Sequence, residues 1–278
     1  MRNISVKQVE TAVAQLCEQA NFKLGLDIVN ALKRSIKYET SSLGKATLKA
    51  LIENAKIARR ESIPICQDTG TAVVFLKVGQ DVHFTGGNLT AAIQRGVARG
   101  YRYLRKSIVA SPLQRENTRD NTPAIIHYEI GPGNKVHITV SAKGAGSENS
   151  SALKMFKPSD GFPAIKKFVV EQIKQTGASA CPPLIVGIGI GGNFKEAPTL
   201  AKKALLRPVG QKNRDPKLAK LERELLKAIN LTGVGPAGFG GKTTALAVHI
   251  VEAPCHIASL PVAINIGCHA NRHKEIIL

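Results

Sequence analysis

The sequence contains no tryptophan, and aromatic residues make up only 4% of its 278 residues. Proteins that bind single-stranded nucleic acid commonly stack bases on aromatic side chains, and no helix-turn-helix, zinc-finger or RNA-binding signature is present. The net charge of +19 comes from lysines and arginines spread along the chain. A solvated basic surface, or attraction to small anions or an acidic subunit, explains this charge better than nucleic-acid binding does.

Long apolar runs are also absent. No stretch approaches the roughly 20 apolar residues that a membrane-spanning helix needs, and the polar segment 1–8 does not resemble a secretory signal. Cysteine is scarce: there are five, an odd number, and they are widely spaced, which argues against a disulfide framework. We therefore expect a cytoplasmic protein without membrane contacts, whose cysteines serve metal binding, catalysis or packing.

Hydrophobic periodicity predicts the secondary structure. Residues 5–60 are expected to be helical, with Ser5 as the cap of the first helix. Two apolar segments, 124–130 and 136–140, flank a Gly-Pro-Gly-Asn turn and predict a β-hairpin. Further helices are predicted at 89–106, 164–176, 195–206 and 215–230, and further strands at 72–78, at 184–190 and on either side of the Cys-His pair at 255–256.

This order of elements predicts an α+β fold, in which a helical N-terminal region packs around mixed or antiparallel sheets. The 43% hydrophobic content is sufficient for a sizeable core. We expect one domain spanning residues 1–278, composed of a helical part, 1–60, and a part that contains the sheets, 61–278.

Residues 62–71 present four chemically different side chains in a row. A thiol, an amide, a carboxylate and a hydroxyl follow one another from Cys66 to Thr69, directly before Gly70. Pro64 disfavours a helical conformation for the preceding residue, and Gly70 allows a positive φ, so a rigid turn is expected before the strand at 72–78. The structural alternative is a buried cysteine beside an Asx turn at Asp68.

Three glycine-rich segments suggest anion binding to different degrees. Residues 142–151 could bind an anion at the N-terminus of a helix capped by Ser147, although an ordinary turn explains them equally well. Residues 187–192 resemble a dinucleotide fingerprint, but the glycines lie inside an apolar run. Residues 238–243 resemble a phosphate loop, but Pro236 stands where that motif needs glycine. The last two segments are therefore interpreted as packing turns.

Cys66, Cys181 and Cys268 each stand near a proline or glycine at the predicted end of an element. Their wide separation excludes a compact zinc finger or a Cys-x-x-Cys run, so a shared ligand would be held by distant segments. Three thiolates on a cubane iron–sulfur cluster leave one iron free to act as a Lewis acid on a hydroxyl and a carboxylate.

Four motifs, taken in order, resemble the catalytic half of the iron–sulfur hydro-lyases, that is, class I fumarase and L-tartrate dehydratase. The resemblance covers most of the chain, whose length is similar to that of the alpha subunit of the two-subunit form. The motifs are Cys66-Gln67-Asp68-Thr69-Gly70-Thr71, Lys143-Gly144-Ala145-Gly146-Ser147-Glu148-Asn149, Ala180-Cys181-Pro182-Pro183 with Gly191-Gly192, and Gly267-Cys268-His269-Ala270-Asn271-Arg272.

The resemblance implies a role for each matching residue. Cys66, Cys181 and Cys268 would hold a 4Fe–4S cluster. Gln67 and Asp68 would contact a small dicarboxylate substrate, with Asp68 also acting as an acid/base or orienting group.

Three further positions complete the implied site. Arg105 and the backbone N–H of Gly146 would bind substrate carboxylates. His256 would pair with the catalytic carboxylate. Cys255 is a spare thiol that could compete as a ligand.

The resemblance also implies an activity and a partner. The expected reaction is the reversible hydration of fumarate to L-malate, with dehydration of L-tartrate to oxaloacetate as the alternative. The chain would be the alpha subunit of a higher oligomer and would be active only with a beta subunit that supplies the base. The alternative of a different class is a non-catalytic, basic protein that binds a metal or nucleic acid.

Overall fold

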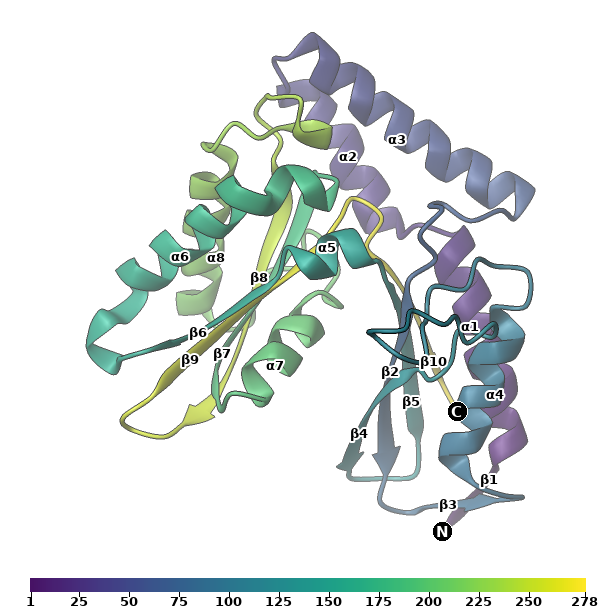
Figure 1. The fold of residues 1–278 in the computed structure, drawn as a ribbon. Coiled ribbons are helices and arrows are strands. Elements are labelled where there is room, and N and C mark those ends of the chain that lie inside the picture. Colours follow the sequence, from purple (N-terminus) through teal and green to yellow (C-terminus); the bar gives the residue numbers. More distant parts are fainter. The chain divides into compact units, whose positions relative to one another are not determined.

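The computed structural model describes all residues from 1 to 278 (Figure 1). The chain forms two compact units. The first unit comprises residues 1–24, 55–145 and 272–278, and the second comprises 25–54 and 146–271. Helices alternate with two mixed four-stranded sheets and a parallel pair of short strands, which confirms the predicted α+β class. No helix has both the length and the apolar character needed to cross a membrane. That residues 1–278 form a single domain stays a prediction.

The first unit contains a four-stranded sheet in the order β10-β5-β2-β4, together with two helices that pack on each other, α1 and α4. Close approach of these helices requires glycine, because a Cβ on Gly96 would lie 2.7 Å from the carbonyl oxygen of Glu10. The elements are β1 (Arg2–Ser5), α1 (Val6–Phe22), β2 (Thr71–Gly79), β3 (Val82–Thr85), α4 (Leu89–Gly100), β4 (Ile125–Gly131), β5 (Val136–Lys143) and β10 (Arg272–Ile277).

The predicted hairpin of β4 and β5 is wrong. β2 lies between these strands, parallel to β4 and antiparallel to β5. The connecting turn instead binds the end of β2: Gly79 N–H donates to Lys135 O at 2.8 Å, and Gln80 N–H donates to Gly131 O at 2.8 Å. The turn residues were recognisable from the sequence, but the third strand inserted between β4 and β5 was not.

The helix predicted at 89–106 ends at Gly100 instead. Tyr101 and Leu104 are buried in the core of the first unit, and Leu104 N–H donates to Tyr101 O at 3.0 Å in a tight turn. The helix therefore ends at Gly100, and the following residues form a turn that places these two side chains in the core. Arg105 consequently lies in a loop and not on a helix.

The second unit contains a sheet in the order β6-β9-β7-β8, with α7 on one face and α6 and α8 on the other (Figure 1). Its elements are α2 (Leu26–Tyr38), α5 (Ala145–Asn149), β6 (Ala152–Phe156), α6 (Gly161–Thr176), β7 (Leu184–Gly192), α7 (Glu196–Ala204), α8 (Pro216–Asn230), β8 (Ala245–Cys255) and β9 (Leu260–Gly267), while α3 (Ser42–Glu61) begins in this unit and ends in the first. Short 3-10 helices occupy Pro158–Asp160, Gly177–Ala180 and Pro236–Gly238.

Two glycines of β7 allow α7 to lie directly on the sheet. A Cβ on Gly187 would lie 2.2 Å from Ala201 O, and a Cβ on Gly189 would lie 2.1 Å from Ala197 O. The glycine-rich segment thus allows close packing, as predicted, but Gly187 and Gly189 lie within strand β7 and not in the predicted turn. The helix predicted to follow a Ser147 cap is in fact α5, which has five residues and begins before Ser147.

The loop at 238–243 holds a carboxylate of the protein itself. The backbone N–H groups of Lys242 and Thr243 donate to the carboxylate of Glu39 at 3.0 and 2.9 Å. Burial alone raises the pKa of Glu39, but hydrogen bonds from the backbone of Lys242, Ser41 and Thr40 and from Thr243 outweigh burial, and the pKa falls from 4.5 to about 2. The loop is similar to a phosphate loop in that its backbone N–H groups bind an anion, which here is the carboxylate of Glu39.

We expect Glu39→Gln to lower the free energy of unfolding at pH 7 by about 2 kcal/mol. The folded-state pKa of Glu39 lies below its unfolded value of 4.5, so this stabilisation is fully present above pH 4.5 and disappears as the pH falls towards 2. Urea unfolding at pH 7 and pH 3 measures the effect, and the difference between wild type and variant should shrink at pH 3. Exposed Glu18 provides the control Glu18→Gln. Equal loss of stability in both variants at pH 7 would refute this account of Glu39.

Candidate active site

The turn that contains Cys66 is held from several sides within the first unit. Thr69 donates its hydroxyl to Arg105 O at 2.5 Å and accepts a hydrogen bond from the Tyr101 hydroxyl through its own carbonyl at 3.0 Å. Gly70 has φ +75°, and a Cβ there would lie 2.7 Å from the backbone of Lys143. These contacts make the turn rigid and fix the side chains that it carries.

Asp68 is oriented by backbone donors. Its Oδ1 accepts from Gly70 N–H at 2.9 Å and its Oδ2 accepts from Ala145 N–H at 2.7 Å. The guanidinium of Arg272, which is buried, donates to the backbone carbonyl of Asp68 at 2.7 Å and to Asn21 Oδ1 at 3.2 Å. The carboxylate therefore keeps one direction, and each of its oxygens retains a lone pair for a further donor.

A cavity of about 310 Å³ opens beside this carboxylate. It brings together Gln67, Asp68 and Arg105, which the sequence predicts as substrate-binding residues. All of its lining belongs to the first unit and consists of Gln67, Asp68, Arg105, Lys106, Ser107, Asn117 and Ala145. Gly146 is the next residue after this lining and begins a segment of the second unit.

The cavity combines positive charge with hydrogen-bonding groups. The guanidinium of Arg105 is exposed and makes no hydrogen bond or ion pair, so it is available to a ligand carboxylate. Lys106 Nζ donates to Arg102 O at 2.6 Å, which holds the ammonium group on the same loop. A small dianion with a hydroxyl group matches these features, because cations would bind its carboxylates and polar side chains its hydroxyl.

Sequence reasoning missed three residues of the cavity: Lys106, Ser107 and Asn117. Asn117 Nδ2 donates to Lys106 O at 2.9 Å, and Ser107 N–H donates to Asn121 Oδ1 at 2.7 Å. The polar loop at 117–123 therefore folds back onto the loop of Arg105. Its density of Asn, Thr and Asp was the available signal, but such loops usually indicate turns alone.

The predicted cysteine ligands are divided between the units. Cys66 is half-buried in the first unit, whereas Cys181 and Cys268 lie in the second. The segments of Cys181 and Cys268 are neighbours, because His269 N–H donates to Cys181 O at 3.3 Å at the end of the sheet where β7 begins and β9 ends. None of these thiols forms a disulfide, and all three are more accessible than Cys17, which is fully buried in the core.

The donor chemistry of these thiols fits an iron–sulfur cluster, which proteins bind through thiolates. Within either unit, no group of three or more His, Cys, Asp or Glu side chains could hold a metal ion. Cys181 has φ +56°, an uncommon value for a residue with a side chain, and such local strain is often found at functional positions.

Cys255 and His256 lie at the opposite end of the second unit's sheet. Cys255 pairs with Gly192 at the end of β7, whereas Gly267, next to Cys268, pairs with Ile185 near its beginning. At about 3.3 Å per residue, the length of β9 separates His256 from Cys268 by roughly 25 Å. His256 is exposed, and its Nδ1 accepts a hydrogen bond from Ala258 N–H at 3.1 Å. Its predicted pairing with Asp68 stays a prediction.

Comparison with known proteins gives a consistent result over almost the whole chain. A family model described as fumarate hydratase (Fumerase) matches residues 10–277. A putative L(+)-tartrate dehydratase subunit alpha of Methanocaldococcus jannaschii is 46% identical over 273 residues, which are 95% of this chain and 95% of that protein. The L(+)-tartrate dehydratase subunit alpha of Escherichia coli (strain K12) is 32% identical over 286 residues, covering 99% of this chain and 92% of that protein.

Proposed function

The chain belongs to the fumarate hydratase (Fumerase) family, and from this we propose that it is the alpha subunit of an iron–sulfur hydro-lyase acting on a four-carbon dicarboxylate. The names of its relatives favour L(+)-tartrate as substrate, and the family description favours the fumarate and L-malate pair that the sequence predicts. The observation that carries the proposal is the cavity that unites Gln67, Asp68 and Arg105.

Arg105 and Lys106 would bind the carboxylates of the substrate. Arg105 offers a free, planar guanidinium that can bind a carboxylate with two hydrogen bonds. The backbone N–H of Gly146 is proposed as a further donor to a carboxylate. The same three donors would also stabilise the additional negative charge that develops on a carboxylate when a proton leaves the neighbouring carbon.

Asp68 would act as the oriented acid/base or positioning group, with Gln67 beside it as a hydrogen-bonding partner of the substrate. The N–H groups of Gly70 and Ala145 hold its carboxylate in one direction without occupying all of its lone pairs. In the hydration direction the free lone pairs can accept a proton from the water that adds to the substrate, and in dehydration the protonated carboxyl group can return this proton to the leaving hydroxyl. The base that acts on the neighbouring carbon is proposed to belong to a beta subunit.

Cys66, Cys181 and Cys268 would together hold a 4Fe–4S cluster. When bound, a cluster with three cysteine ligands supplies one Lewis-acidic iron that has no protein ligand. The rigid turn from Cys66 to Gly70 would keep Asp68 close to that position.

His256 is proposed to pair with the carboxylate of Asp68. The histidine is exposed, and its Nδ1 accepts a hydrogen bond from Ala258 N–H at 3.1 Å, which leaves Nε2 available to a partner.

Anaerobic purification of the chain with and without a co-purifying beta subunit tests the proposed function. We expect the chain alone to contain iron and sulfide but to show no turnover, and the complex to dehydrate L(+)-tartrate or to interconvert fumarate and L-malate. Turnover by the isolated chain would refute the need for a partner. An iron-loaded complex that is inactive on L(+)-tartrate, D-tartrate, fumarate and L-malate would refute the proposed substrate class.

A further inference from the structure

β8 forms an edge of the second unit's sheet, and side chains cover this edge at two places. Near its start, Asn230 Nδ2 donates to Ala245 O at 3.2 Å, and its Oδ1 accepts from Ala245 N–H at 2.8 Å. Further along, Glu222 Oε1 accepts from Ile250 N–H at 2.7 Å, and Asn213 Nδ2 donates to Ile250 O at 3.1 Å. These side chains occupy the places where a neighbouring strand would bind.

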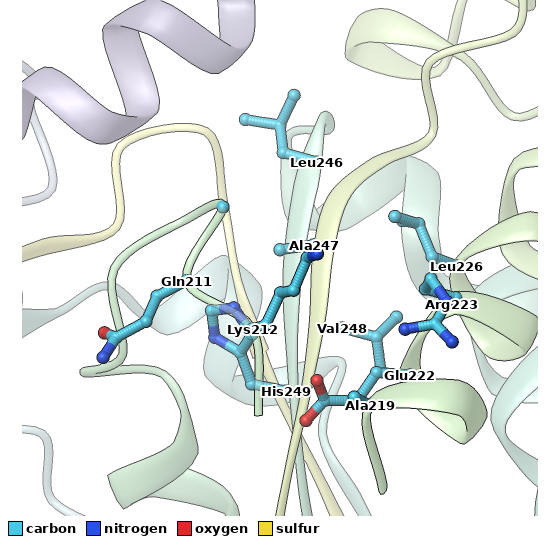
Figure 2. A pocket seen from close by; sticks show the side chains of 11 residues that line it. Gln211, Lys212, Ala219, Glu222, Arg223, Leu226, Leu246, Ala247, Val248 and His249 are labelled. Carbon is cyan, nitrogen blue, oxygen red and sulfur yellow. The ribbon is translucent and has the colours of Figure 1, made fainter. Parts of the chain in front are cut away.

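Val248 lies between the two covered positions. Backbone groups alternate in direction along a strand, so the N–H and C=O of Val248 point to the same edge as those of Ile250. No side chain makes a hydrogen bond to them, and a cavity of about 150 Å³ opens at this place (Figure 2). A cavity of that size can hold an aromatic ring, and the backbone here offers the ring an adjacent donor and acceptor.

Two side chains with an acceptor atom that makes no hydrogen bond line the same cavity. His249, only 3% exposed, donates from Nδ1 to Ala204 O at 3.1 Å, and its Nε2 makes no hydrogen bond. Burial and the charge of Arg207 lower the pKa of His249 to about 4, so the ring is neutral at pH 7 and Nε2 is an acceptor. Glu222, 7% exposed, makes its hydrogen bonds through Oε1, which leaves Oε2 available. Both residues line the cavity, so a ligand hydroxyl can reach these two acceptor atoms.

Unpaired positive charge surrounds the cavity. Lys212 and Arg223 line it, are exposed, and form no ion pair. Arg223 and Leu226 also line an adjoining hollow of about 480 Å³, which Lys227 and Lys242 border. Leu226 and Leu246 provide apolar walls for the inner cavity. An anion with an apolar, planar end would therefore find complementary surfaces in both spaces.

We propose that this cavity binds a nucleotide. The base would bind the N–H and C=O of Val248, the ribose hydroxyls would donate to Glu222 Oε2 and His249 Nε2, and the phosphate would bind Arg223 and the neighbouring lysines. A peptide strand does not fit, because Asn230, Asn213 and Glu222 already cover the edge on both sides of Val248. Inorganic phosphate alone would leave the apolar walls and the two acceptors without partners.

The nucleotide site shares no residue with the cavity of Gln67, Asp68 and Arg105. It can therefore be tested independently of the proposed hydro-lyase function. Calorimetric titration of the full chain with AMP, GMP, CMP and UMP is the direct experiment, with ribose 5-phosphate and inorganic phosphate as probes that lack the base. We expect at least one nucleotide to bind at a single site, at least tenfold more tightly than either probe.

Substitutions test whether the nucleotide binds in this cavity. Lys212→Gln combined with Arg223→Gln should weaken the nucleotide at least tenfold, since both charges are at the surface and their loss spares the core. Lys217→Gln on the same helix, outside the cavity lining, is the matched control and should bind like wild type, as should Arg105→Gln. The proposal is overturned if no nucleotide binds, if nucleotides bind no better than ribose 5-phosphate, or if the double variant retains full affinity.

Discussion

Cys66→Ser is expected to remove most of the iron from the anaerobically purified protein and to reduce hydro-lyase activity of the complex to background. A serine oxygen is a poorer ligand for cluster iron than a thiolate, and Cys66 is the sole cysteine of the candidate set in the first unit. The same result is expected for Cys181→Ser and Cys268→Ser, because loss of any ligand leaves an incompletely held cluster. Iron and sulfide analysis, together with the visible absorption spectrum, measures the effect.

Cys255→Ser is the matched control, since Cys255 is exposed and lies at the other end of the sheet from Cys181 and Cys268. It should retain iron and activity. Loss of iron from this variant, or full retention in Cys66→Ser, would contradict the ligand set.

Asp68→Asn is expected to lower kcat by about 10² to 10⁴-fold while the iron content stays unchanged. The amide has the shape of the carboxylate and can still accept a hydrogen bond from Gly70 N–H through its oxygen. Its NH₂ group, however, cannot accept from Ala145 N–H as Asp68 Oδ2 does. The variant loses both the proton acceptor and part of the contact network that orients it, and steady-state kinetics with the intact complex quantify the loss.

A matched control for this variant is Asp81→Asn, because Asp81 belongs to the same unit and is exposed on the turn after β2. It should leave kcat unchanged. If Asp68→Asn retains kcat within threefold, or if it loses iron to the extent that Cys66→Ser does, Asp68 has no direct role in the chemistry.

Features determined by neighbouring residues were predictable from the sequence. Ser5 caps α1 as expected, with its hydroxyl accepting from Lys7 N–H at 3.2 Å, and the Gln8 side chain completes the capping box. The glycines of β7 were correctly expected to serve packing, because glycine in an apolar segment indicates close approach of another element, but they lie in a strand and not in the expected turn.

Features determined by distant residues were not predictable. The pairing of β2 with both β4 and β5 depends on a strand that comes earlier in the sequence, so the turn between β4 and β5 gave a misleading signal. The motif that contains Cys268 and Arg272 was evident from the sequence, but the contact that Arg272 makes with the turn of Asp68 was not. This buried arginine reaches Asp68 O across 204 positions of sequence, and only the folded chain reveals that it holds the turn.

The lining of the cavity beside Asp68 was partly predictable, because some of its residues are neighbours in sequence and others are not. Gln67 and Asp68 are adjacent in sequence, and Arg105 entered through its similarity to a family motif. Asn117 joins them only because its side chain binds the backbone of Lys106. A polar loop alone gives no indication of which cavity it borders.

Mössbauer spectroscopy of the ⁵⁷Fe-loaded complex, with and without L(+)-tartrate or L-malate, tests the central claim most directly. The account predicts a 4Fe–4S spectrum in which one iron differs from the others and changes when the substrate is added. A protein that assembles no cluster, or a cluster whose irons all remain unaffected by every diacid substrate, would contradict it.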